Sequence, residues 1–116
     1  MVVLNRIKRA GLPEPLTEYV FCPGRKWRFD FCWNIDLQWP FENINVYQRS
    51  WDNLHKVAIE WEGGIFSGGR HVRPLGFIGD CQKYNRAVLM GWKILRYHSK
   101  NLDDLVPDLQ KLLNIT

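Results

Sequence analysis

The chain has 116 residues, of which 46% are hydrophobic and 24% charged, so it can bury the core of one domain and wholesale disorder is excluded. It contains no run of about 18 apolar residues, and its first residues lack a secretory pattern, so we expect a cytoplasmic protein without a membrane segment. The net charge of +4 favours a polyanionic partner. The spacing of Cys22, Cys32 and Cys81 argues against a disulfide scaffold or a zinc site, and predicts reduced, mostly buried thiols.

The spacing of apolar residues predicts a helix over residues 2–10, which Gly11 ends. Residues 17–21 and 26–33 are predicted as two strands of a hairpin, joined by a turn at Pro23-Gly24. The period of two in the second strand divides its residues between two faces, with Trp27, Phe29, Phe31 and Trp33 on one and Arg28, Asp30 and Cys32 on the other.

Residues 34–55 show no clear periodicity and are predicted as an insertion within a single domain that spans residues 1–116. The insertion is rich in aromatic residues, and two interpretations stay open. The aromatic side chains cap the core, or they form a surface for a partner subunit or for base stacking.

The second half of the chain predicts the order strand, helix, strand, helix. Residues 56–62 alternate as a strand, residues 92–97 form another, and a terminal amphipathic helix covers about residues 102–113, with Pro107 in its first turns or at a kink. A helix over about residues 76–90 is predicted from an apolar stripe of Phe77, Ile78, Cys81, Tyr84, Val88 and Leu89. The whole order predicts an α/β fold with a mixed four-stranded sheet flanked by helices.

Three carboxylates lie in otherwise hydrophobic strands: Asp30, Glu60 and Glu62. Glu60 and Glu62 share one face about 7 Å apart, and Asp30 can join them if the second and third strands are neighbours. Three converging oxygen ligands suit Mg²⁺ or Mn²⁺. The alternative is the polar face of a half-exposed strand that simply carries acids, and spacing alone leaves both interpretations open.

Cationic residues flank these acids in the sequence, which fits a phosphodiester backbone as the substrate. They are Arg25, Lys26, Arg28, Arg70, His71, Arg73, Lys83 and Arg86.

Five segments together resemble the PD-(D/E)xK nuclease superfamily: R-K-W-R-F-D-F-C-W, V-A-I-E-W-E-G-G, G-R-H-V-R, G-D-C-Q-K-Y-N-R-A and G-W-K-I-L-R-Y. The resemblance covers about residues 2–98 and is nearest to small phage or bacterial endonucleases of the very-short-patch-repair-like and VRR-NUC branches. It implies a restriction-endonuclease-like αβββαβ core plus a C-terminal helix, Mg²⁺ or Mn²⁺ as the cofactor, DNA as the partner, and the cytoplasm of a bacterial or phage-infected cell.

By this resemblance, Asp30 is the acid of the PD half, with Phe29 in place of proline. Glu60 is the first acid of (D/E)xK, and Glu62 stands where the motif has lysine. Either Glu62 acts as general base or metal ligand, or Lys83 on the following helix supplies the missing ammonium. Weaker matches are Gln82 and Tyr84, beside Lys83 in a partial helix motif, and Glu18, similar to an extra acid before Asp30.

The expected function is a metal-dependent endonuclease that recognises the structure or backbone of nicked, branched or duplex DNA. Asp30, Glu60 and Glu62 would bind the metal, and His71, with Arg70 or Arg73, would orient the scissile phosphate or transfer a proton. A homodimer is compatible with this activity.

Two alternatives stay open. The missing lysine at position 62 favours a nuclease-like fold that binds DNA without cutting it. The aromatic insertion and the leucine-rich last helix favour a protein-interaction module.

Overall fold

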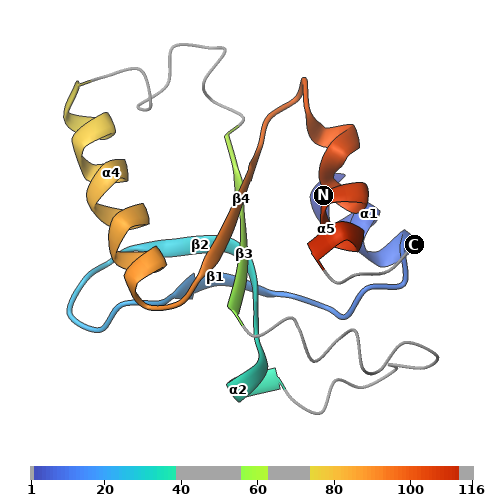
Figure 1. Cartoon of the computed structure of the whole chain (residues 1–116), viewed down its shortest axis with the longest axis horizontal. Coiled ribbons are helices and arrows are strands. Elements are labelled where there is room, and N and C mark those ends of the chain that lie inside the picture. Colours follow the sequence, from blue (N-terminus) through green and yellow to red (C-terminus); the bar gives the residue numbers. More distant parts are fainter. Residues whose placement is uncertain (1, 39–55, 63–73, 113–116) are drawn as a thin grey trace.

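The computed structural model describes residues 2–38, 56–62 and 74–112 (Figure 1). Its elements are the helices α1 (Val2–Arg9), α2 (Ile35–Gln38), α4 (Pro74–Leu89) and α5 (Leu105–Leu112), the short 3-10 helix η3 (Leu102–Asp104), and the strands β1 (Leu16–Val20), β2 (Arg28–Asn34), β3 (Lys56–Trp61) and β4 (Lys93–Tyr97). Each predicted helix and strand that falls within these residues is present, with its ends shifted by up to three residues. Of the predicted insertion, residues 35–38 form α2 and residues 39–55 lie outside the described residues.

The four strands form one sheet in the order β1-β2-β3-β4. The pairs β1–β2 and β2–β3 are antiparallel, whereas β3 and β4 are parallel, and the segment that joins β3 to β4 contains α4. Parallel neighbours need such a crossover connection, because a short turn cannot return the chain to the same end of the sheet. The predicted α/β class, with a mixed four-stranded sheet flanked by helices, is therefore confirmed.

One face of the sheet packs against α1 and α5 (Figure 1). Val3 and Ile7 come from α1 and Leu105 and Leu109 from α5, and all four are buried with apolar residues of the strands. Pro107 lies at the third position of α5, where a missing N–H costs no intrahelical hydrogen bond. Proline in the first turn, rather than at a kink, is therefore the correct one of the two expectations.

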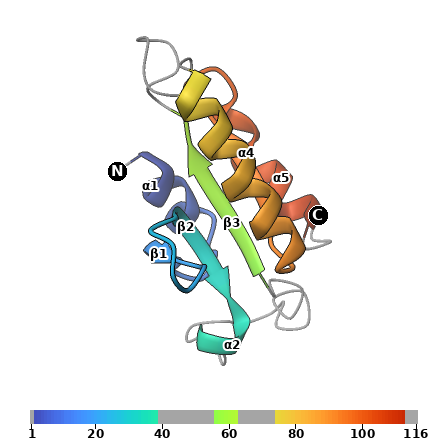
Figure 2. The ribbon, with the colours of Figure 1, turned by 90° about the vertical axis from the view of Figure 1, so that its left-hand side faces the viewer.

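The other face of the sheet packs against α4, which runs beside β3 in the opposite chain direction (Figure 2). Ala87 is the helix residue that is buried with the apolar residues of this face. Cys22 and Cys32 are buried there as free thiols, whereas Cys81 is a free and exposed thiol on α4. Burial, followed by the charge of Glu60, raises the pKa of the Cys32 thiol to about 12, which keeps it protonated.

Most of the apolar stripe of α4 faces away from the sheet, and Tyr84 is the member of the stripe that turns toward it. Phe77, Ile78, Val88 and Leu89 are exposed, and Leu89 keeps 83% of its surface. The sheet-facing side carries Ala87 together with polar side chains, including Asp80 and Lys83. The reason is local: this part of the helix lies over acidic side chains of β2 and β3 rather than over an apolar surface.

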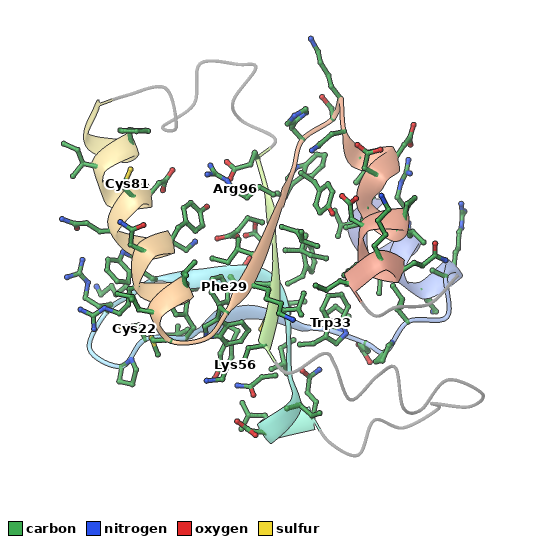
Figure 3. All side chains as sticks on the ribbon, viewed as in Figure 1. Cys22, Phe29, Trp33, Lys56, Cys81 and Arg96 are labelled. Carbon is green, nitrogen blue, oxygen red and sulfur yellow. The ribbon has the colours of Figure 1, made fainter. Side chains whose placement is uncertain are left out.

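The faces of β1 and β2 switch at the residue pair Glu18 and Asp30. Phe29 packs with Cys32 on the α4 side, whereas Phe31 and Trp33 pack on the α1/α5 side, and Figure 3 shows Phe29 and Trp33 on opposite sides of the sheet. The expected single face of Trp27, Phe29, Phe31 and Trp33 is therefore wrong.

The paired strand β1 switches at the same place. Leu16 and Tyr19, three residues apart, both pack on the α4 side, and the register places Glu18 opposite Asp30. Glu18 has a φ of 51°, in the left-handed region that few residues other than glycine adopt. Each strand thus holds one extra residue, like a β-bulge shared by both partners.

None of the helices within residues 2–38, 56–62 and 74–112 is long and apolar enough to cross a membrane.

Candidate active site

The strands β2 and β3 stop pairing at Asp30 and Glu60, where side chains take over the hydrogen bonds. The regular register ends with Phe31 opposite Ile59. Beyond that pair, the backbone N–H of Asp30 donates to Glu60 Oε2 at 3.1 Å, and the backbone N–H of Trp61 donates to Asp30 Oδ2 at 2.8 Å. These two bonds hold the carboxyl groups of Asp30 and Glu60 at the place where the strands separate.

Helix α4 brings Lys83 to this pair of acids. Lys83 Nζ donates to Glu60 Oε1 in an ion pair whose side chains are 16% and 5% exposed. Burial raises the pKa of Glu60 to about 7; the ammonium of Lys83 lowers this pKa, and the neighbouring Asp30 carboxylate raises it. A carboxyl group with this pKa can exchange a proton near neutral pH.

Glu62 follows β3 and is held by groups from β4 and α4. Its Oε1 accepts a hydrogen bond from Arg96 Nε at 2.7 Å and from the Tyr84 hydroxyl at 3.4 Å. The Arg96 guanidinium also lies 4.6 Å from the centre of the Tyr84 ring. Burial, followed by the charges of Glu60 and Glu62, raises the pKa of Tyr84, so the phenol stays a hydrogen-bond donor.

A cleft of about 330 Å³ opens over these groups between the sheet and α4. Its acidic side chains are Glu18, Asp30, Glu60, Glu62 and Asp80, and its cations are Lys26, Arg28 and Lys83. Arg28 Nη1 and Glu18 Oε2 are 3.9 Å apart at the exposed edge. The cleft therefore combines a buried acidic floor with cations from the β1–β2 hairpin and from α4.

Most of the sequence-predicted site residues meet in this cleft. It is lined by Asp30, Glu60, Glu62 and Lys83, by the predicted DNA-binding Lys26 and Arg28, and by the weaker candidates Glu18 and Tyr84.

The other predicted site residues do not line the cleft or cannot be placed. Gln82 and Arg86 are exposed on α4 and are absent from the lining, and Arg25 lies over the ring of Trp27. Arg70, His71 and Arg73 lie outside the described residues, so their predicted roles stay predictions.

Arg96 and Trp27 were missed as site residues by the sequence analysis. Arg96 lies opposite Glu60 in the parallel register of β3 and β4, and Figure 3 shows its side chain on the α4 side of β4. The β3–β4 register follows only once the crossover connection is known, so the sequence gives no direct signal that Arg96 lies at this site. The period of two groups Trp27 with Phe29, Phe31 and Trp33, but Trp27 is only partly buried and lines the cleft.

Asp30 and Glu60 are the residues whose chemistry fits a divalent ion. Mg²⁺ is commonly held by one or two carboxylates, with water and substrate phosphate completing its ligands. Each carboxylate oxygen has two lone pairs, so the bonds from the Asp30 and Trp61 N–H groups and from Lys83 leave acceptor capacity. Within residues 2–38, 56–62 and 74–112, no group of three or more His, Cys, Asp or Glu side chains is arranged to hold a metal. The expected three-carboxylate set with Glu62 thus stays a prediction.

Comparisons with known proteins found no family model, no curated protein and no solved structure that matches this chain.

Proposed function

We propose that the protein is a metal-dependent endonuclease that hydrolyses DNA phosphodiester bonds in the cleft between the sheet and α4. The observation that carries the proposal is the meeting of Asp30, Glu60 and Lys83 in one cleft beside Lys26 and Arg28. A buried acidic pair beside a lysine, with further cations at the edge, suits a phosphate group and a divalent ion together. The α/β fold with a parallel β3–β4 pair is compatible with the restriction-endonuclease-like core that the sequence resemblance implies.

In this proposal, Asp30 and Glu60 hold one Mg²⁺ or Mn²⁺ ion at the floor of the cleft. A divalent ion there polarises the phosphoryl group and neutralises charge that develops on its oxygens. Lys83 donates a hydrogen bond to a phosphate oxygen, and Lys26 and Arg28 bind neighbouring phosphates.

Glu62 is the group that replaces the expected motif lysine, and its contact with Arg96 gives it a different role from Asp30 and Glu60. The Arg96 guanidinium donates a hydrogen bond to Glu62 and fixes the orientation of its side chain beside Tyr84. From this position Glu62 accepts a proton from water that enters the cleft, while Lys83 serves as the ammonium of the site.

The test is a cleavage panel of linear, nicked, flapped and four-way DNA with Mg²⁺, Mn²⁺ or EDTA. The isosteric variants D30N and E60Q should lose metal-dependent cleavage but keep the circular dichroism spectrum of the wild type. The matched control D36N, an exposed acid on α2, should cleave like the wild type. Equal cleavage by D30N, E60Q and the wild type would contradict the proposal.

DNA binding without cleavage is the second candidate function. It is favoured by Glu62 in place of the motif lysine and by the ion pair in which Lys83 already neutralises Glu60. This candidate predicts DNA binding that weakens as the salt concentration rises. In calorimetry, it predicts that the wild type and D30N show the same heat when Mn²⁺ is added.

A further inference from the structure

A chain of contacting planar groups leads from the core to the edge of the cleft. The rings of Phe29 and Phe21 are stacked with centres 4.1 Å apart and planes 6° from parallel. Phe21 stacks in turn on Trp27 at 6.3 Å and 18°, and the Arg25 guanidinium lies 3.8 Å from the centre of the Trp27 ring. Exposure increases along the series: Phe29 and Phe21 are buried, Trp27 is partly buried and Arg25 is exposed.

Trp27, the ring of this stack that carries Arg25, lines the same cleft as the acidic pair. Trp27 lines the cleft together with Asp30 and Glu60, and its two sequence neighbours, Lys26 and Arg28, line it as well. The wall of the cleft on this side is therefore an aromatic ring between two cations. The buried rings of Phe21 and Phe29 support Trp27, so its side chain loses little conformational entropy when a ligand binds.

Aromatic rings and guanidinium planes are the groups on which nucleic-acid bases stack. A base inside a duplex already has both faces covered by its neighbours, so it cannot offer a face to a side chain. An unpaired base in a flap, a loop or a single-stranded end can do so. A cleft of about 330 Å³ is also at the small end of ligand sites, which suits one nucleotide rather than a wide groove.

We propose that the exposed Arg25 guanidinium, held on the ring of Trp27, forms a stacking platform for an unpaired nucleotide base at the edge of the cleft, which makes DNA with a locally single-stranded segment the preferred substrate class. The inference rests on the proposed function, because it assumes that the cleft takes a nucleic-acid phosphate. Lys26 and Arg28 bind the phosphates on either side of the stacked base, and the base is recognised through its π-face rather than its hydrogen-bonding edge.

The test measures binding in EDTA, so that cleavage plays no part. Fluorescence anisotropy compares a labelled single-stranded oligonucleotide with an abasic strand of the same length and phosphate charge. We expect the wild type to bind the base-bearing strand tighter by about 5- to 150-fold, the range for one stacked base. W27L keeps an apolar side chain, although a smaller one, and removes the π-system under Arg25, so it should bring this ratio close to one, whereas W27F should retain most of it.

Two charge variants separate stacking from phosphate attraction. K26A should weaken the binding of both strands by the same factor and leave the ratio unchanged. R25K keeps the charge but removes the planar group. It should therefore lower the ratio of base-bearing to abasic affinity, while the affinity for the abasic strand changes less. The inference is overturned if the wild type binds both strands equally, or if W27L weakens both equally because Trp27 serves only the core.

These outcomes are distinct from those that test the endonuclease proposal. Metal-dependent cleavage without any preference for the base-bearing strand, or without binding of either single strand, overturns the stacking inference alone. A Trp27-dependent preference without metal-dependent cleavage overturns the endonuclease proposal alone.

Discussion

The backbone N–H of Asp30 donates a hydrogen bond to Glu60 Oε2, at the point where β2 and β3 stop pairing. The backbone N–H of Trp61 donates in turn to Asp30 Oδ2, so each carboxyl group is fixed by a main-chain donor of the other strand. The Asp30 N–H also stabilises the carboxylate form of Glu60 beside a second acid. Lys83 is the third member of this arrangement, and it comes from the helix on the opposite wall.

Lys83 is predicted to matter for both stability and turnover. The variant K83M should lower the free energy of unfolding at pH 8 by about 2 kcal/mol, because the buried Glu60 loses a charged hydrogen-bond donor. Its kcat for DNA cleavage should fall about 100- to 1,000-fold, as for the loss of one donor to the developing charge. Urea unfolding and single-turnover cleavage measure the two effects.

The matched control for Lys83 is K93M, at an exposed position of β4. It should change the free energy of unfolding by no more than about 0.5 kcal/mol. Equal stabilities for K83M and K93M would show that the contact with Glu60 contributes nothing.

The raised pKa of Glu60 predicts a pH-dependent stability. The pKa is about 7 in the folded protein and has the ordinary value of 4.5 in the unfolded chain, so the folded state holds this proton more tightly. The resulting stabilisation is fully present below pH 4.5 and is lost as the pH rises through 7, with a total of at most about 3 kcal/mol. E60Q cannot titrate at this position.

The comparison is therefore between the wild type and E60Q, each unfolded in urea at pH 4.5 and at pH 8. The wild type should lose stability relative to E60Q across this interval. A difference that is constant, or that grows in favour of the wild type at pH 8, would show that the pKa of Glu60 is not raised.

Arg96 is predicted to stabilise the protein through Glu62. R96M leaves a buried carboxylate without its guanidinium and should lower the free energy of unfolding by about 2 kcal/mol. The double variant E62Q/R96M should lose less than the sum of the two single variants, because both remove the same interaction. R9M, at an exposed position of α1, is the control. Additive losses in the double variant would mean that the two residues are not coupled.

The outward apolar stripe of α4 predicts an unusual tolerance. F77S and L89S should change the free energy of unfolding by no more than about 0.5 kcal/mol, because these side chains are exposed. A87L, by contrast, enlarges a fully buried residue and should cost about 1–3 kcal/mol. If the stripe faced the sheet, F77S would instead cost about 3–5 kcal/mol, so thermal unfolding of these three variants decides the orientation.

The fold class could be predicted from the sequence because each core strand carries its own signal. Residues 56–62 combine alternating apolar residues with β-branched side chains, and the helix that follows leaves a parallel pairing as the simple connection to residues 92–97. These are local patterns, and the central strands β2 and β3 bury the apolar residues that make them, on both faces of the sheet.

The direction of the α4 stripe could not be predicted in the same way. Periodicity shows which side of a helix is apolar, but it does not show which side meets the sheet. Lys83 faces the sheet because Glu60 offers it a buried partner. The predicted meeting of Asp30 with Glu60, by contrast, needed only two neighbouring strands.

The sequence pattern does not reveal the face switch in β2, because Phe29, Phe31 and Cys32 are all apolar. A period of two and a shifted period look alike when both faces of the strand are buried. The contact of Arg96 with Glu62 was hidden for another reason, since the residues are 34 positions apart and meet only through the β3–β4 register.

The extra residues Glu18 and Asp30 have a consequence for how such a chain can evolve. If both were deleted, Leu16 and Tyr19 would return to a spacing of two, as would Phe29 and Cys32, and both strands would alternate regularly. Deleting only one would put the two paired strands out of step and turn apolar side chains to the wrong side. The two acids and the face switch at which they lie are therefore inherited together. Insertions or deletions in β1 and β2 are expected to occur in matched pairs.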